Sequence, residues 1–158
     1  MDDIGSAAGV TGPALYHHFA GKEAMLVAAL APTCEGLLVG GQARMARHAG
    51  DPKAALESLV EFHVAFALAN PGVISLSLHE LDRLPEEPRR EIRRVQRLYV
   101  EVWVDALTAV RTELTPAEAR VLAHAAFGLM NSTPFLGGEV DRDRRAELLR
   151  TATLAALL

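Results

Sequence analysis

The chain has 158 residues, of which 50% are hydrophobic and 5% aromatic, and its net charge at pH 7 is −4. A chain of this length and apolar content can bury the core of one large domain or of two small ones. The negative charge excludes a protein that binds nucleic acid by being basic throughout, so any DNA contact must be local. Abundant Ala and Leu beside few aromatic residues favour an all-α fold.

The cellular location follows from the cysteine content and the apolar runs. Cys34 is the single cysteine and cannot form an internal disulfide, and the N-terminus does not read as a secretion signal. Gly, Pro or a charge interrupts each apolar run before it reaches the roughly 18 residues of a membrane helix. We therefore expect a cytoplasmic protein with no membrane partner.

Residues 2–19 are predicted to form two short helices joined by a tight turn at Gly9, with the spacing of a helix-turn-helix. Apolar residues occupy the inner faces of both helices and the corner between them: Ile4, Ala7, Ala8, Val10, Leu15 and Phe19. The outer face of the second helix is then free to enter a DNA groove. An ordinary helical hairpin with Tyr and His on its surface is the alternative.

The stretch 4–23 closely resembles the signature of the TetR family of repressors, Ile-Ala-x-x-Ala-Gly-Val-Ser-x-x-x-Leu-Tyr-x-His-Phe-x-x-Lys-Glu. The matching positions include Ala8, Gly9, Val10, Leu15, Tyr16, His18, Phe19, Lys22 and Glu23, whereas Thr11 replaces the usual serine and Gly5 the usual alanine. The resemblance implies an all-α, TetR-like protein in which a helix-turn-helix is followed by a helical bundle for ligand binding and dimerisation.

The same resemblance implies which residues contact operator DNA: Thr11, Gly12, Pro13, Tyr16, His17, His18 and Lys22. Thr11 and Gly12 lie at the N-terminus of the second helix, where a hydroxyl and free backbone N–H groups can bind phosphate. Residues 12, 13, 16 and 17 are expected to face base edges in the major groove. Lys22 adds a positive charge for a further phosphate.

The chain departs from the family in one respect, because the family has another, basic helix before the position of Asp2. The local charges of Asp2, Asp3 and Glu23 against Lys22 are also unfavourable for DNA. We therefore expect weak or no DNA binding by the chain as it stands, and we interpret Met1 as a misplaced start within a longer protein. A truncated paralogue that dimerises and binds ligand without operator recognition is the alternative.

A long helical segment, residues 22–48, follows the motif. Pro32 is expected to kink or divide it, because proline lacks a backbone donor and clashes with the preceding turn. We place the domain boundary there. Residues 1–31 form a partial helix-turn-helix DNA-binding domain with the start of the connecting helix, and residues 32–158 form the helical ligand-binding and dimerisation domain.

Two amphipathic segments are predicted to pack on each other in the second domain. The segment 51–70 carries one apolar face, made of Leu56, Leu59, Val60, His63, Phe66 and Ala67. The clearest stripe of the chain follows it, made of Ile92, Val95, Leu98, Tyr99, Val102, Trp103, Ala106, Leu107 and Val110. A second patch, Val100 and Val104, predicts that this helix packs on more than one face.

The last two helices are predicted to form the interface of a homodimer. Thr115 and Glu118 make a capping box at the start of the first one, and small residues dominate residues 118–130. The final helix, 141–158, is expected to turn one set of residues toward a partner: Ala146, Leu149, Ala152, Thr153, Ala156 and Leu157. Two such helices from each copy suit a four-helix interface.

Residues 78–85, 97–103 and 127–134 resemble a branch of TetR-like regulators common in actinobacteria, in which the C-terminal helices often surround a pocket for apolar or acyl-thioester ligands. The candidate pocket residues are Phe62, His63, Phe66, Arg97, Tyr99, Trp103, Phe127 and Met130. Core packing is the alternative for each aromatic residue, and an ion pair with Glu101 is the alternative for Arg97.

Catalysis and metal binding are not predicted. His79 and Glu80 are followed by Arg83 where a zinc hydrolase would have a second histidine, and neither His63 nor His124 has metal-ligand spacing. No nucleophile elbow, phosphate loop or dinucleotide glycine pattern occurs. The sequence thus predicts a repressor without cofactor that binds operator DNA as a homodimer and responds to a small ligand.

Overall fold

The computed structural model describes residues 21–158, which in that range form six α-helices and two single-turn 3-10 helices and no strand. The elements are α3 (Lys22–Arg47), α4 (Pro52–Ala69), α5 (Pro71–Glu80), η1 (Leu81–Arg83), α6 (Glu86–Val110), α7 (Pro116–Met130), η2 (Thr133–Phe135) and α8 (Arg142–Leu157). The all-α prediction is confirmed. The two helices predicted for residues 2–19 lie outside the described residues.

Helix starts coincide with the cap signals of the sequence. The Asp51 and Asp141 carboxylates each accept a hydrogen bond from the backbone N–H three residues on, at 3.0 and 2.9 Å. At α7 the predicted capping box is confirmed, because Thr115 Oγ1 accepts from the Glu118 N–H at 3.3 Å while the Glu118 carboxylate accepts from the Thr115 N–H at 2.8 Å.

Pro32 lies inside α3 and does not divide it, so that part of the expectation is wrong. The Thr33 hydroxyl donates to the carbonyl of Ala29 in the same helix at 2.8 Å. Helix α3 also packs against α4, α5 and α6, and this tertiary packing holds the helix continuous across the proline.

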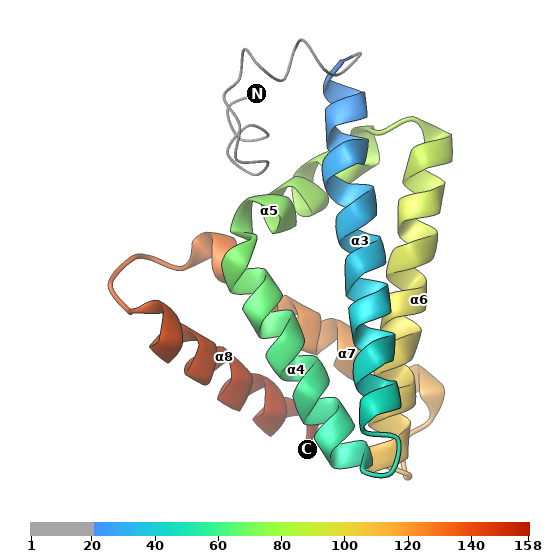
Figure 1. Ribbon diagram of the computed structural model, residues 1–158, viewed down its shortest axis with the longest axis vertical. Coiled ribbons are helices and arrows are strands. Elements are labelled where there is room, and N and C mark those ends of the chain that lie inside the picture. The colour runs from blue at the N-terminus through green and yellow to red at the C-terminus, as the bar shows by residue number, and fades with distance from the viewer. Residues whose placement is uncertain (1–20) are drawn as a thin grey trace.

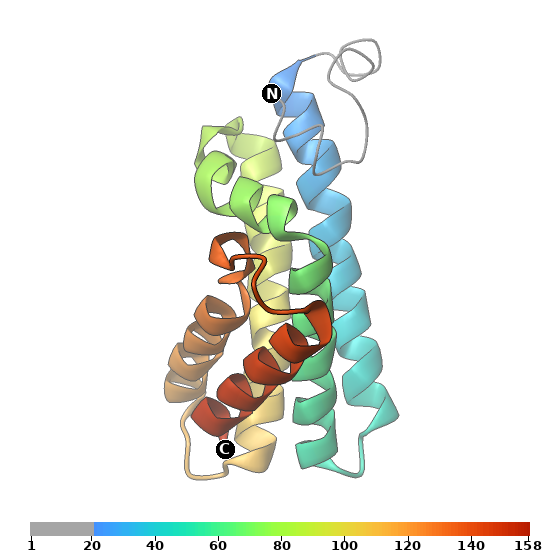
Figure 2. The same cartoon turned by 90° about the vertical axis from the view of Figure 1, so that its left-hand side faces the viewer.

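The two longest helices, α3 and α6, lie side by side, and α4 packs against both (Figure 1). The chain bends by 87° between α4 and α5, so α5 crosses the bundle near the start of α3. Helix α8 runs obliquely over α4 and α7 (Figure 2). The predicted packing of α4 on α6 is therefore confirmed, and α4 contacts α3 and α8 as well.

Two apolar clusters hold the bundle together. One joins α4, α6, α7 and α8 around the fully buried Trp103, Leu107 and Met130. The other joins the first half of α3 to α5, η1 and the start of α6, around Leu26 and Leu30. The first half of the bundle thus has an apolar cluster of its own, and the partly buried Leu38 packs against both clusters.

The predicted stripe of α6 is correct except at one position. Leu98 is 41% exposed, so the buried face of α6 is narrower than the stripe that the sequence indicated. Val104, assigned to the second patch, is buried. Helix α6 therefore packs on more than one face, as predicted.

Four of the six α8 residues that were predicted to face a partner contact the bundle of their own chain instead, whereas Ala152 and Ala156 are exposed. Thr153 and Leu157 are buried, and Ala146 and Leu149 pack against the core cluster of α4, α6 and α7. The error has a physical cause, since a helix that covers a core must first bury its best apolar face within the chain. The exposed side of α8 carries Leu148 beside the two exposed alanines.

Helix α3 differs from the expectation that no apolar segment reaches the length of a membrane span. By length and composition alone, α3 could cross a membrane. This is weak evidence of a span, since a core helix of a soluble protein passes the same test, and α3 packs along the bundle.

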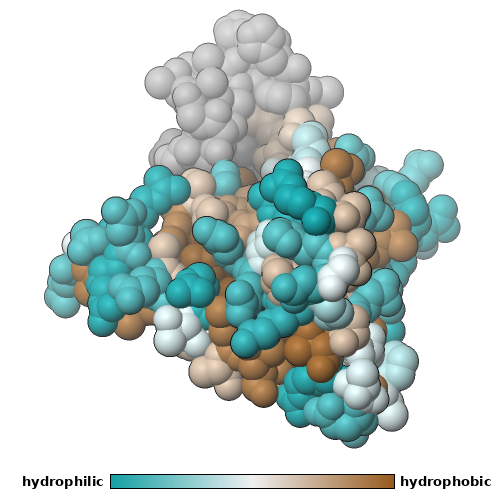
Figure 3. Space-filling view, turned by 60° about the horizontal axis from the view of Figure 1, so that its bottom comes forward, coloured by the Kyte–Doolittle hydropathy of each residue, from teal (hydrophilic) through white to brown (hydrophobic). Residues whose placement is uncertain are grey.

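At the end of the molecule opposite the start of α3, hydrophilic residues surround patches of hydrophobic ones (Figure 3).

Candidate functional site

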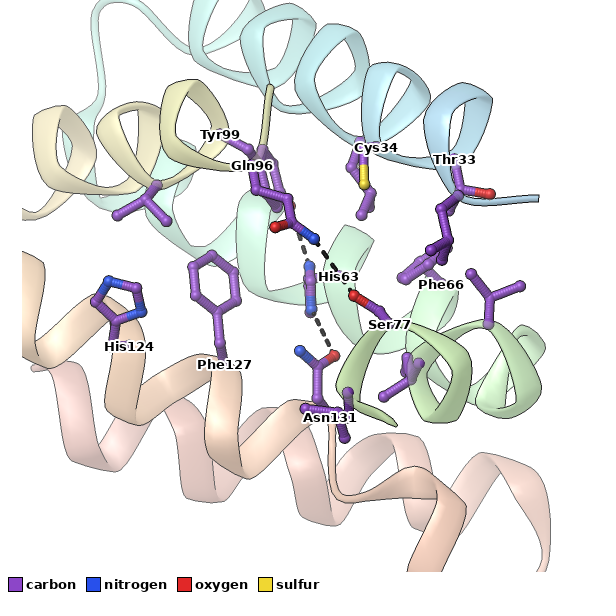
Figure 4. Close-up of a pocket in the computed structure, with 16 residues that line it drawn as sticks. Thr33, Cys34, His63, Phe66, Ser77, Gln96, Tyr99, His124, Phe127 and Asn131 are labelled. Atoms are coloured by element: carbon purple, nitrogen blue, oxygen red, sulfur yellow. Dashed lines mark hydrogen bonds between the residues drawn. The ribbon is translucent and has the colours of Figure 1, made fainter. Parts of the chain in front are cut away.

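A cavity of about 230 Å³ lies where the two apolar clusters meet, enclosed by α3, α4, α5, α6 and α7. Figure 4 shows the side chains that point toward it. Its lining consists of Leu30, Thr33, Cys34, Leu37, His63, Phe66, Val73, Ile74, Ser77, Leu78, Gln96, Tyr99, Val100, His124, Phe127 and Asn131. Half of these residues are aliphatic or Phe side chains, so the cavity is apolar with a few polar groups.

Aromatic rings form one side of the cavity. The ring centroid of Phe127 lies 5.0 Å from that of His63, 5.7 Å from that of Tyr99 and 5.1 Å from that of Trp103. Trp103 is fully buried behind this layer and does not line the cavity. The rings meet at tilted and edge-to-face angles, which are the arrangements that aromatic quadrupoles favour.

His63 is the central polar group and is buried between two partners (Figure 4). Its Nε2 lies 3.0 Å from Asn131 Oδ1, which can only accept, so Nε2 carries the proton. Its Nδ1 then accepts from the Tyr99 hydroxyl at 3.2 Å. Burial lowers the pKa of His63 to about 4, and the imidazole is therefore neutral at pH 7.

Tyr99 is held in place by a close approach of α3. A Cβ on Gly41 would lie 2.8 Å from Tyr99 Cε2, so only glycine lets the backbone of α3 pass the ring at this distance. Burial raises the pKa of Tyr99 well above its ordinary value, and its hydroxyl stays a hydrogen-bond donor to His63.

The opposite side of the cavity carries smaller polar groups from α3, α5 and α6. Gln96 Nε2 donates to Ser77 Oγ at 3.3 Å, which links α6 to α5. The Thr33 hydroxyl is engaged with its own helix, and burial raises the pKa of the Cys34 thiol. These groups are uncharged, so both sides of the cavity offer neutral hydrogen-bonding partners.

Four of the eight predicted pocket residues line the cavity, namely His63, Phe66, Tyr99 and Phe127. Phe62 instead lies under the Arg44 guanidinium, 3.8 Å from the ring centroid. Trp103 and Met130 are fully buried in the core. For Trp103 and Met130 the structure agrees with the alternative of core packing, whereas Phe62 is half-buried and belongs to neither core cluster.

Arg97 is exposed on α6 and does not line the cavity. The alternative, an ion pair of Arg97 with Glu101, does not form either. Glu101 pairs instead with Arg120 of α7, whose guanidinium donates to both carboxylate oxygens at 2.9 and 2.8 Å. The expected intrahelical pair of Arg97 with Glu101 is therefore replaced by a link between α6 and α7.

Sequence reasoning missed several lining residues, of which Ser77, Gln96 and Asn131 carry hydrogen bonds. Asn131 directly follows the last residue of α7, and a polar residue that ends an apolar helix was the one available signal. Ser77 and Gln96 have no such signal, because their position depends on the fold of α5 back toward α6.

Among the predicted DNA-contacting residues, the structure places only Lys22, and the others lie outside the described residues: Thr11, Gly12, Pro13, Tyr16, His17 and His18. The Lys22 ammonium forms an ion pair with the Glu80 carboxylate at 2.8 Å and so joins the start of α3 to the end of α5. This pair lowers the pKa of Glu80.

Within residues 21–158, no group of three His, Cys, Asp or Glu residues is placed to hold a metal ion. His63 uses both ring nitrogens on Asn131 and Tyr99, whereas His79 and His124 are exposed on different helices.

Comparisons with known proteins identify the family. The profile for the tetracyclin repressor-like C-terminal domain matches residues 49–135, more than half of the chain, and the profile for bacterial regulatory proteins of the tetR family matches residues 1–29. The second match covers the region in which the sequence predicted a helix-turn-helix. No curated protein sequence matches the chain.

Solved structures agree with these matches. A TetR-family transcriptional regulator from Bordetella parapertussis shares 26% identity with a TM-score of 0.76, over 96% of this chain and 82% of that one. A TetR/AcrR family regulator from Thermobifida fusca shares 25% identity with a TM-score of 0.70, over 97% and 84%. A regulator from Thermus thermophilus has the same fold at 22% identity and a TM-score of 0.74, over 99% and 86%. The chain therefore belongs to the TetR family of bacterial transcription regulators.

Proposed function

We propose that the protein is a cytoplasmic repressor that binds operator DNA as a homodimer and leaves it when a small ligand enters the cavity. The family supports DNA binding through the motif in residues 2–19. The observation that carries the ligand part is the cavity itself, which is apolar, holds fixed polar groups and opens between five helices. We propose a regulatory role and no catalysis.

Helix α3 is the element that connects the two proposed parts, residues 1–31 and 32–158. It runs without a break through the proposed boundary, and Leu30, Thr33, Cys34 and Leu37 place four of its side chains on the cavity. A ligand that displaces α3 would therefore move the DNA-binding part at its N-terminal end. Coupling of this kind needs two arrangements of α3 that the ligand and the DNA favour differently.

The ion pair of Lys22 with Glu80 supports α3 as the moving element. It joins the start of α3 to α5, and α5 contributes Val73, Ile74 and Ser77 to the cavity. A ligand that pushes α5 and α3 apart would strain this pair. An exposed pair of this kind contributes little to stability, so it can be exchanged for another contact when α3 moves.

The homodimer is proposed to form through the exposed sides of α7 and α8. Val121 of α7 is 69% exposed and Leu148 of α8 is 46% exposed, although both are large apolar residues on helices with otherwise well-buried inner faces. Small residues beside them, Ala125 and Ala152, are exposed too and would let a second copy approach closely. Apolar surface of this kind marks interaction sites.

Sedimentation velocity tests the dimer. Val121→Glu and Leu148→Glu should convert a dimer into monomers, because each places a charge in the proposed interface. The matched control is Val39→Glu, since Val39 of α3 is 64% exposed and lies on neither interface helix. A dimer that survives both substitutions contradicts the assignment to α7 and α8.

The ligand is proposed to be a small apolar compound. An acyl-thioester was the other expectation, and only its acyl chain matches the lining, because among the described residues no Lys or Arg lines the cavity to bind the phosphates of such a ligand.

A gel shift tests operator recognition, with DNA from the promoters of the protein's own gene and its neighbours. Both the chain and a version extended by any in-frame codons upstream of Met1 are needed. We expect a retarded complex that His17→Ala weakens, since His17 is predicted to face base edges. Dimerisation and ligand binding without operator recognition would favour the alternative, a paralogue that does not recognise an operator.

A further inference from the structure

No Asp, Glu, Lys or Arg of the described residues lines the cavity. Two histidines belong to the lining, and burial keeps His63 neutral at pH 7, whereas His124 is exposed on α7. Arg44, a cation on the same helix as Leu37, donates to the Gly40 carbonyl at 2.9 Å and lies over Phe62, outside the cavity. A carboxylate or phosphate bound beside His63 would lose its water without gaining a Lys or Arg partner, so the lining selects against anions.

The size and walls of the cavity fit a flat ring. An apolar cavity of about 150 Å³ takes up benzene, so a volume of about 230 Å³ has room for one ring with a substituent or for two small rings. Phe66, Tyr99 and Phe127 come from three helices and line the same space (Figure 4). Aromatic walls set at an angle to one another can contact both the face and the edge of a flat guest.

The side-chain amide of Asn131, on the cavity wall, has a fixed orientation and a hydrogen-bond donor without a partner among the described residues. His63 Nε2 donates to Asn131 Oδ1, and this bond fixes which way the Asn131 amide points. Within the described part of the chain no residue accepts a hydrogen bond from Asn131 Nδ2, which belongs to the cavity lining. The free Nδ2 donor matches an oxygen acceptor on a ligand.

We propose that the cavity takes an uncharged aromatic compound of one or two rings with a carbonyl or ether oxygen, its ring among Phe66, Tyr99 and Phe127 and its oxygen on Asn131 Nδ2. This inference rests on the proposed function and names the class of its ligand. His63 is then a positioning residue, which acts through Asn131.

Isothermal titration calorimetry with three probes of nearly equal size tests the class. Acetophenone is neutral and has the acceptor, benzoate is its anionic counterpart, and ethylbenzene lacks the oxygen. We expect acetophenone to bind at least about tenfold more tightly than either of the others, which is the discrimination that one good hydrogen bond gives.

Two variants test the anchor. Asn131→Asp keeps an acceptor for His63 and removes the donor, and Asn131→Leu removes both. Each should abolish the preference for acetophenone over ethylbenzene. The matched control is Gln42→Leu, an exposed residue of α3 outside the cavity, which should keep that preference. Thermal unfolding shows that the variants are folded.

The outcomes separate the ligand class from the proposed function. Benzoate that binds as tightly as acetophenone, or a preference that survives both Asn131 variants, overturns the class and leaves the cavity as a ligand site. No binding of acetophenone at about 1 mM overturns it too. Operator recognition is measured independently by the gel shift, so the repressor proposal can fail while the ligand class stands.

Discussion

Two glycines of α3 provide a sharp test of how this helix packs. Gly36 and Gly41 both lie in the interior of the helix, but their surroundings differ. A Cβ on Gly36 would meet nothing within 4 Å, whereas a Cβ on Gly41 would lie 2.8 Å from Tyr99 Cε2 and 3.5 Å from Leu59 Cδ2. Alanine at the two positions should therefore have opposite effects.

The expected magnitudes follow from two effects. Alanine in place of glycine stabilises a helix interior by about 1 kcal/mol, and Gly36→Ala should show this gain in full. At Gly41 the same gain is opposed by overpacking, which costs about 1–3 kcal/mol in a well-packed core. The Tyr99 ring cannot shift freely, because its hydroxyl is hydrogen-bonded to His63 and the ring packs on Phe127. Gly41→Ala should thus be about 1–3 kcal/mol less stable than Gly36→Ala.

Urea unfolding followed by circular dichroism measures both free energies. The Gly41→Ala variant should also bind acetophenone more weakly than Gly36→Ala, because a displaced Tyr99 narrows the cavity. Equal stabilisation by the two substitutions would refute the close approach of α3 to Tyr99 and with it this wall of the cavity.

Three further predictions concern the buried histidine, the stripe of α6 and the cap of α7. Burial lowers the pKa of His63 from 6.5 to about 4, so the unfolded chain takes up a proton at a higher pH than the folded protein does. The folded state is therefore stabilised by about 3 kcal/mol above pH 6.5, and this stability is lost as the pH falls to 4. Urea unfolding between pH 7 and 4 should show a smaller loss in His63→Gln, and an equal loss would contradict the assignment. Leu107→Ala should destabilise by about 2–5 kcal/mol and Leu98→Ala by less than about 0.5 kcal/mol, since Leu107 is fully buried and Leu98 is 41% exposed. Similar losses of stability for the two variants would mean that the buried face of α6 is wrongly assigned. Thr115→Ala should lower the thermal stability by about 1 kcal/mol because the capping box is lost, and an unchanged melting temperature would argue against that box.

The helices and their caps could be predicted because their signals are local. Thr115 and Glu118 are three residues apart, and the stripe of α6 repeats within one helix. Local signals failed where contacts with residues distant in the sequence determine the shape or the burial of a helix. Pro32 is tolerated because α3 is packed along its length, and Leu98, next to the buried Tyr99, falls just outside the contact face.

The pocket was only half predictable for the same reason. A repeat of apolar residues identifies the inner side of a helix but does not tell whether the space opposite is filled. Trp103 lies one turn from Tyr99 on the same stripe, yet it is fully buried in the core while Tyr99 faces the cavity. Asn131 and His63 are 68 positions apart and meet only through the packing of α7 on α4.

Sequence-specific DNA binding can be measured by fluorescence anisotropy with promoter DNA and with scrambled DNA of equal length at one fixed salt concentration. We expect the protein, including any in-frame codons upstream of Met1, to bind the promoter at least about 10³-fold more tightly than the scrambled duplex. Equal affinity for the two duplexes would contradict this expectation.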